Sequence, residues 1–218
     1  GQDVFHAAGL AARMLGEAGL DRDTLESASR VLVNPVLTRD GAAPPDNPFV
    51  GVAGARPEIW SYGHRNLLGL TFDKSGRLWE QEMGPQGGDE LNLIKPGRNY
   101  GYPKVSNGSH YDGRDIPDHA PGDGFEAPKL WWNPVISPGG LAYYDGALFP
   151  QWKNSLFIGG LSSQSLIRIA LNGDKATKAD QWPMGARIRD VEQGPDGALW
   201  LIEDARGSQG RLLRLTPP

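Results

Sequence analysis

From residue 67 onward, the chain repeats one pattern: a short apolar run, a polar turn that contains glycine, and a second apolar run. Three of these repeats read "LGLTFDKSGRLWEQE" (68–82), "SLIRIALNGDKATKADQW" (165–182) and "RDVEQGPDGALWLIED" (189–204). In their turns Gly76, Gly173 and Gly197 follow Ser, Asn and Asp, which is where a tight hairpin needs a positive φ angle. The pattern therefore predicts pairs of antiparallel strands.

Two further segments extend the pattern. The stretch "GLAYYDGALFPQWKNSLFIGGL" (140–161) has a longer connection between its apolar runs, and "GRLLRLTPP" (210–218) supplies another strand. Antiparallel units that recur every several tens of residues, with irregular loops between them, are typical of a β-propeller. A β-sandwich is the alternative, but this spacing fits a propeller blade better than sandwich strands.

The N-terminal residues have a different composition. Residues 1–30 are rich in Ala, Leu, Glu and Arg, and their apolar spacing predicts a short helix that ends near Gly19. We therefore treat residues 1–44 as a divergent N-terminal segment, a remnant of an earlier blade or helix. Residues 45–218 are predicted to form the propeller blades.

Composition narrows the function classes. The net charge is −4, the pI is about 5.6, and the basic residues are scattered, which argues against a nucleic-acid partner. The absence of cysteine excludes disulfides, thiolate metal sites and a cysteine nucleophile. No apolar run approaches the roughly 20 residues that cross a bilayer, so we expect no membrane span. No signal peptide is visible at Gly1.

A Gly-rich acidic loop is the first candidate site. It reads "EQEMGPQGGDELNLIKPGRNYGYP" (80–103). Glu82, Asp89 and Glu90 bring negative charge, and the turn around Gly84 can expose backbone carbonyls. Ca²⁺ takes six to eight such oxygen ligands. The alternative is a solvated acidic loop, because the acidic spacing is not that of an EF-hand.

Three other segments carry side chains suited to a planar anion. His, Arg and Asn stand together in "WSYGHRN" (60–66). Arg187 and Arg189, two apart on a predicted strand, share one face and could meet an anion, or they could pair with nearby carboxylates. Trp131 and Trp132 could stack on a ring or fill the core. Together with a divalent cation, these features describe a pocket for a planar polycarboxylate.

The motifs also resemble a known family. The segment "EIWSYGHRNLLGLTFDKSGRLWEQEMGPQGGDELNLIKPGRNYGYP", with "DNPFV", "LFPQWKNSLFIGGL" and "RIRDVEQGPDGALWLIED", resembles the soluble aldose sugar dehydrogenases of the glucose/sorbosone dehydrogenase family. The likeness runs from about Pro45 to the C-terminus. It implies an all-β fold, a β-propeller of the six-bladed quinoprotein glucose dehydrogenase type. The propeller would be incomplete, with about four blades.

The resemblance implies specific roles. Residues expected to contact the cofactor pyrroloquinoline quinone (PQQ) are Arg65, Asn66, Trp132, Arg187 and Arg189. The carbonyls of Gly84 and Pro85 would hold the Ca²⁺ that binds PQQ, and Glu90 with Tyr100 would bind a second, structural Ca²⁺. The reaction would oxidise an aldose at C1 to its lactone and pass electrons to an acceptor, in the periplasm or outside the cell.

The departures from the family pattern leave alternatives open. The family's catalytic base is a histidine in a motif like "HxGGR", which is not found here, so the catalytic residue is unknown. A family lysine near the cofactor aligns with Ser162. The alternatives are a non-catalytic Ca²⁺-binding propeller fragment and a propeller lactonase, which would not need Arg187 with Arg189. The open edges of an incomplete propeller also predict either a homo-oligomer or coverage of the open side by residues 1–30.

Overall fold

A computed structural model describes residues 31–33, 42–204 and 210–217 of the chain. These residues fall into two compact units, which are described separately. The first unit is Gly1–Asn66, Ile94–Ser106 and Pro117–Ala127, and the second is Leu67–Leu93, Asn107–Ile116 and Pro128–Pro218. Among the described residues, none of the helices has the length and apolar character needed to cross a membrane.

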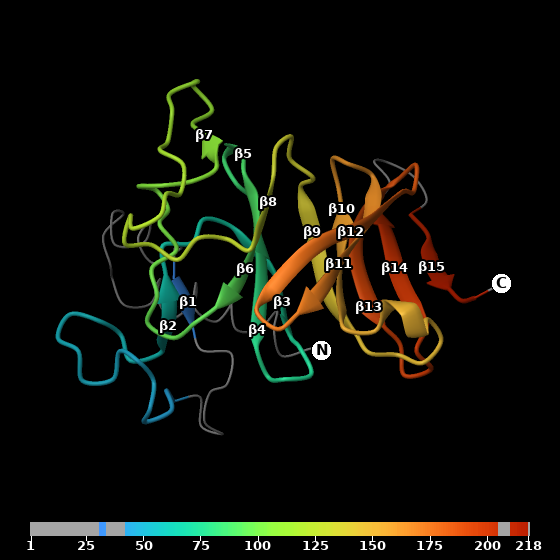
Figure 1. Cartoon of the computed structure of the whole chain (residues 1–218), viewed down its shortest axis with the longest axis horizontal. Helices are drawn as coiled ribbons and strands as arrows, with labels where there is room; N and C mark the ends of the chain where they lie inside the picture. Colours follow the sequence, from blue (N-terminus) through green and yellow to red (C-terminus); the bar gives the residue numbers. More distant parts are fainter. Residues whose placement is uncertain (1–30, 34–41, 205–209, 218) are drawn as a thin grey trace. The chain divides into compact units, whose positions relative to one another are not determined.

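The second unit is built from antiparallel sheets (Figure 1). The first sheet has the order β3 (Leu67–Phe72), β4 (Leu78–Glu82), β6 (Asp89–Ile94) and β8 (Leu130–Trp132). The next sheet runs from β9 (Pro138–Tyr144) through β10 (Ser155–Gly160) and β11 (Ser165–Asn172) to β12 (Lys175–Pro183). The last sheet contains β13 (Arg187–Gln193), β14 (Leu199–Asp204) and β15 (Leu212–Leu215). A short pair, β5 (Gln86–Gly87) with β7 (Gly108–Ser109), and one 3₁₀ turn, Pro150–Trp152, complete the described elements of this unit.

The predicted hairpins are confirmed. Strands β3 and β4, β11 and β12, and β13 and β14 pair antiparallel, each pair with one register shift along its length. Their turns contain Gly76, Gly173 and Gly197 at φ angles of 76°, 59° and 81°. Only glycine adopts such angles without strain, so the turn residues determine where each pair of strands reverses.

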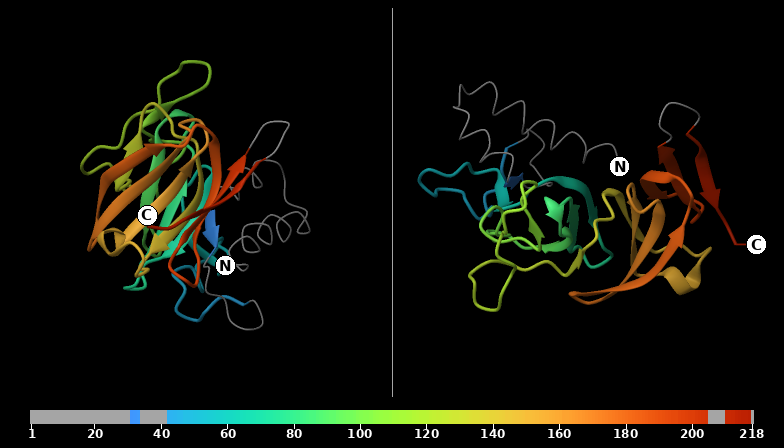
Figure 2. Two further views of the ribbon diagram at one scale, coloured as in Figure 1. Left: turned by 90° about the vertical axis from the view of Figure 1, so that its right-hand side faces the viewer. Right: turned by 90° about the horizontal axis from the view of Figure 1, so that it is seen from above.

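The three sheets of the second unit stand side by side (Figure 2). Strand β9 contacts both β3 and β13. Apolar residues fill the spaces between them. One cluster includes Trp79, Leu91, Trp132, Leu156 and Ile158, and the other includes Tyr144, Phe149, Phe157, Ile188 and Leu201. Each sheet therefore buries apolar side chains against its neighbour, as the blades of a propeller do.

The first unit contains β1 (Val31–Val33) paired antiparallel with β2 (Ile59–Tyr62), and a parallel bridge between Tyr62 and Asn99. The helix predicted near the N-terminus lies outside the described residues. The boundary predicted between residues 44 and 45 stays a prediction.

Candidate functional site

The Gly84–Pro85 turn follows β4 and is buried. A Cβ atom on Gly84 would lie 2.1 Å from the carbonyl oxygen of Gly87 and 2.4 Å from backbone atoms of Gly88, so only glycine fits there. Within the described part of the chain, neither the Gly84 nor the Pro85 carbonyl accepts a backbone hydrogen bond. Buried carbonyls that accept no backbone hydrogen bond from the described residues fit the role of ligands for a hard cation such as Ca²⁺.

Asp89 accepts hydrogen bonds from backbone amides, although the sequence suggested that its negative charge would face the cation. Its side chain accepts hydrogen bonds from the amides of Gly84 at 3.0 Å, Ile136 at 2.8 Å and Ser137 at 2.7 Å. Asp89 is 1% exposed. Its carboxylate therefore fixes two loops to the start of β6.

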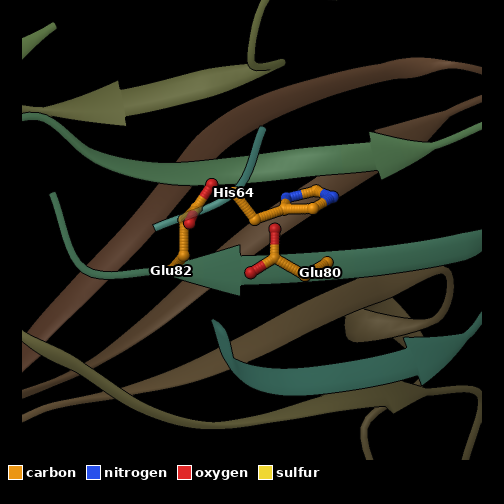
Figure 3. Close-up of side chains that lie close together, drawn as sticks. All are labelled: His64, Glu80 and Glu82. Atoms are coloured by element: carbon orange, nitrogen blue, oxygen red, sulfur yellow. The ribbon is translucent and has the colours of Figure 1, made fainter. Parts of the chain in front are cut away.

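A cluster of buried carboxylates lies on the first sheet of the second unit. Glu80 and Glu82 project from β4 (Figure 3), and Glu90 and Asn92 come from β6. The Asn92 amide nitrogen lies 3.1 Å from Glu80 and 3.3 Å from both Glu82 and Glu90. An amide has only two N–H groups, so it cannot satisfy three carboxylates at once.

The cluster has unmet hydrogen-bonding capacity. Within the described residues, Glu80 Oε1 and Asn92 Oδ1 are buried and have no hydrogen-bond partner. Burial, followed by the nearby charge of Glu82, raises the pKa of both Glu80 and Glu90. Such a group of carboxylates must either hold protons or bind a cation, and oxygen-rich sites of this kind suit Ca²⁺.

Arg187 and Arg189 converge on one carboxylate. Arg187 Nε lies 3.3 Å from Asp204 Oδ2, and Arg189 also donates to that oxygen. A register shift between Ile188 and Asp190 interrupts β13 at this point. The ion pair with Arg189, assisted by Arg187, holds the pKa of Asp204 below its usual value. Two guanidiniums with one carboxylate keep a net positive charge, which suits an anionic ligand.

The two tryptophans of β8 have different environments. Trp132, the predicted cofactor contact, is 7% exposed in the core, and the Lys178 ammonium lies 4.6 Å from its ring centre. Trp131 is 44% exposed. The Trp132 carbonyl accepts a hydrogen bond from Gly88 at 3.0 Å, which joins β8 to the glycine-rich loop. Ser162, at the position of the family lysine, donates to the carbonyl of Val135.

Arg65, Asn66 and Tyr100 belong to the first unit. The Arg65 guanidinium lies 5.9 Å from the centre of the Tyr102 ring, and Tyr102 lines a cavity of about 370 Å³. Tyr100 is buried and stacks on His64 with ring centres 4.6 Å apart. His64 Nε2 lies 2.8 Å from the Ser61 hydroxyl oxygen. The polar residues before β3 are therefore partly buried in a packed turn.

The structure brings some of the predicted residues together. Gly84, Pro85 and Trp132 share a neighbourhood through the contacts of Gly88 and Asp89. Arg187 and Arg189 share Asp204. The role of Glu90 and Tyr100 as ligands of a second Ca²⁺ stays a prediction.

Sequence reasoning missed two members of the carboxylate cluster, Glu80 and Asn92. The available signal was polar residues at alternate positions of two adjacent apolar strands, which places them on one face of the sheet.

Comparison with known proteins identifies the family. The glucose/sorbosone dehydrogenase family pattern matches residues 15–214. The chain is 41% identical over 224 residues to the aldose sugar dehydrogenase YliI of Escherichia coli strain K12, a match that covers all of this chain and 59% of that protein. This chain therefore belongs to the glucose/sorbosone dehydrogenase family.

Comparison with solved structures agrees with this family assignment. A glucose dehydrogenase crystal structure matches with a TM-score of 0.81 and 45% identity, covering 93% of this chain and 59% of that one. The PQQ-bound aldose sugar dehydrogenase of Streptomyces coelicolor matches with a TM-score of 0.66 and 33% identity, covering 89% and 55%. The fold is thus the propeller of PQQ glucose dehydrogenases, confirming the predicted all-β class. The chain spans about three fifths of the length of these relatives.

Proposed function

We propose that this chain carries the PQQ- and Ca²⁺-binding part of a quinoprotein oxidoreductase that oxidises an aldose at C1 to its lactone. The observation that carries the proposal is the Gly84–Pro85 turn, whose buried carbonyls accept no backbone hydrogen bond among the described residues. Similarity to a PQQ-bound aldose sugar dehydrogenase supports the choice of cofactor. The periplasm or cell exterior is the proposed location, by family likeness.

The chain's own residues would bind and orient the reactants. The carbonyls of Gly84 and Pro85 would hold the cation, and the net positive charge of Arg187 and Arg189 would attract the carboxylates of a planar cofactor. When bound, PQQ would supply the two-electron acceptor, and Ca²⁺ would polarise it. The proposal assigns no residue to remove the proton from the sugar hydroxyl.

A PQQ titration followed by tryptophan fluorescence tests this function, in excess Ca²⁺ and again with EDTA. We expect saturable quenching that requires Ca²⁺. Replacing both arginines (Arg187→Ala with Arg189→Ala) should weaken PQQ binding. The matched control is Arg214→Gln, because Arg214 is also paired with a carboxylate, that of Asp196. Equal weakening by the control would contradict the proposed role of the arginine pair.

Activity separates the enzyme from the non-catalytic alternative. The reconstituted protein should reduce an artificial electron acceptor when an aldose is added, and lactone should accumulate. PQQ binding without turnover would favour a cofactor-binding fragment that lacks its base. Failure to bind PQQ together with retained Ca²⁺ binding would favour the non-catalytic Ca²⁺-binding fragment.

A second, structural Ca²⁺ is proposed at the carboxylate cluster. Glu90 was predicted as a ligand from the family likeness, and Glu80, Glu82 and Asn92 lie around it. The oxygen atoms Glu80 Oε1 and Asn92 Oδ1, which lack partners among the described residues, support a cation there. Measured by calorimetric titration, Glu80→Gln should bind one Ca²⁺ fewer than the unmodified protein. An unchanged stoichiometry would contradict a Ca²⁺ site at the cluster.

Self-association through a sheet edge is also part of the proposal. The sheet of β13, β14 and β15 has three described strands, whereas the other two large sheets have four each. Its edge strand β15 pairs with β14 and with no other described strand. Leu212 on β15 is 64% exposed, and its cross-strand neighbour Ile202 is 47% exposed. An edge strand with exposed apolar side chains favours pairing with another copy.

A further inference from the structure

Asp89 connects the Gly84–Pro85 turn, which carries the predicted cation ligands, to the loop that follows Trp132. One carboxylate oxygen accepts the Gly84 amide at 3.0 Å. The other accepts the amides of Ile136 and Ser137 at 2.8 and 2.7 Å. In the register of the sheet Asp89 lies opposite Trp132. A single buried side chain therefore fixes the Gly84–Pro85 turn and the loop that follows Trp132.

Both loops have constrained backbone positions next to Asp89. Ser137 has a φ angle of 48°, a left-handed conformation that is unfavourable for a non-glycine residue, so its backbone needs support. Gly84 is packed against the backbone of Gly87 and Gly88 on the side where a Cβ would stand. Two of the three amide hydrogen bonds to the Asp89 carboxylate reach the Ser137 loop and the third reaches Gly84, so this side chain supports both positions.

We propose that Asp89 is the positioning residue of the cation site: its carboxylate holds the Gly84 amide so that the carbonyls of Gly84 and Pro85 are preorganised for Ca²⁺. The Gly84 N–H belongs to the peptide plane that enters the turn, and the Gly84 carbonyl belongs to the next plane. Holding this amide therefore leaves only the φ and ψ angles of Gly84 between the fixed plane and that carbonyl. Outer groups that orient ligands typically contribute about 10–100-fold to metal affinity. This role rests on the proposed function.

The substitution Asp89→Asn separates the two connections. An asparagine has one accepting oxygen, and its NH₂ group cannot accept an N–H. The oxygen should turn to the side with two donors, Ile136 and Ser137, which leaves the Gly84 amide facing an NH₂ group. The Ser137 loop then stays in place, and the Gly84–Pro85 turn is released.

The matched control is Asp73→Asn. Asp73 is also a buried carboxylate of the same unit, and it accepts hydrogen bonds from the backbone amides of Ser75 and Arg77, the Arg77 guanidinium and the Trp79 indole N–H. It supports the β3–β4 turn and has no contact with Gly84 among its hydrogen bonds. A purely structural role for Asp89 predicts the same outcome for both variants.

Two measurements test the role. The first is the Ca²⁺ concentration that gives half-maximal quenching of tryptophan fluorescence by PQQ. It should rise at least about tenfold in Asp89→Asn and stay unchanged in Asp73→Asn. An equal concentration in Asp89→Asn and the unmodified protein would overturn the role, and so would an equal rise in both variants.

The second measurement is amide hydrogen exchange without PQQ. In Asp89→Asn the Gly84 amide should exchange faster, while the Ser137 amide remains protected. Unchanged protection of Gly84 would overturn the role whether or not PQQ binds. If the unmodified protein showed no Ca²⁺-dependent quenching, the proposed function would fail. The exchange data would then still report separately whether Asp89 holds the turn.

Discussion

Replacing Gly84 by alanine tests the steric basis of the cation site. The new methyl carbon would lie 2.1 Å from the Gly87 carbonyl oxygen, whereas ordinary contact begins at 3.4 Å. The turn must therefore open by about 1.3 Å, and the obstructing atoms belong to the backbone. Overpacking of this kind costs about 1–3 kcal/mol. For a chain of this size Tm falls by about 2–4 °C for each kcal/mol.

The effect on cation binding should be larger than the effect on stability. Ca²⁺–oxygen distances span only about 2.3–2.6 Å, so a shift of this size removes at least one carbonyl ligand. The half-maximal Ca²⁺ concentration for PQQ quenching should rise at least about tenfold.

Gly76→Ala is the control for this substitution. Gly76 has nothing within 4 Å of the Cβ position and a φ angle of 76°. Alanine there costs about 1–2 kcal/mol of backbone strain, a comparable loss of stability, with no change in Ca²⁺ dependence. A Gly84→Ala protein that loses stability like Gly76→Ala but keeps its normal Ca²⁺ dependence would refute the reasoning.

Three other predictions concern charge and association. Burial raises the pKa of Glu80 and Glu90, so their contribution to stability is present below the ordinary glutamate pKa and is lost as pH rises through the raised values. In EDTA the free energy of unfolding, and with it Tm, should therefore fall as pH rises above the ordinary glutamate pKa, by at most about 1.4 kcal/mol per group for each pH unit. Ca²⁺ or Glu80→Gln should reduce this fall, and a flat Tm profile in EDTA would contradict the reasoning. The variant with Arg187→Ala and Arg189→Ala should bind PQQ at least about tenfold more weakly, because each charged hydrogen bond contributes about 1.5–3 kcal/mol. Fluorescence titration measures this affinity, and an unchanged value would contradict the prediction. Leu212→Lys should lower the mass measured by light scattering if β15 pairs with another copy, and an unchanged mass would exclude that edge.

Local turn chemistry made the strand pairs of the second unit predictable. Glycines at Gly76, Gly173 and Gly197 specify where the chain reverses, and alternating apolar residues specify which face is buried. The Gly84–Pro85 turn was found in the same way, from glycines that allow close backbone approach. These signals lie within a few residues of each other in sequence.

The carboxylate cluster and the role of Asp89 could not be predicted in the same way. Glu80 and Asn92 meet only because β4 and β6 pair in one sheet, and polar residues in a strand do not reveal which face is buried. Asp89 bonds Ile136 and Ser137, which are almost fifty positions away, and an acidic residue beside Glu90 reads as another cation ligand. Packing between the sheets likewise determines that Trp132, and not Trp131, belongs to the buried core.

The most direct test of the cofactor site is PQQ titration of the unmodified protein by tryptophan fluorescence, with Ca²⁺ and with EDTA. We expect saturable quenching in Ca²⁺ and its loss in EDTA, because the carbonyls of Gly84 and Pro85 are assigned to the cation that binds the cofactor. No quenching in Ca²⁺, or the same quenching in EDTA, would contradict a Ca²⁺-dependent PQQ site in this chain.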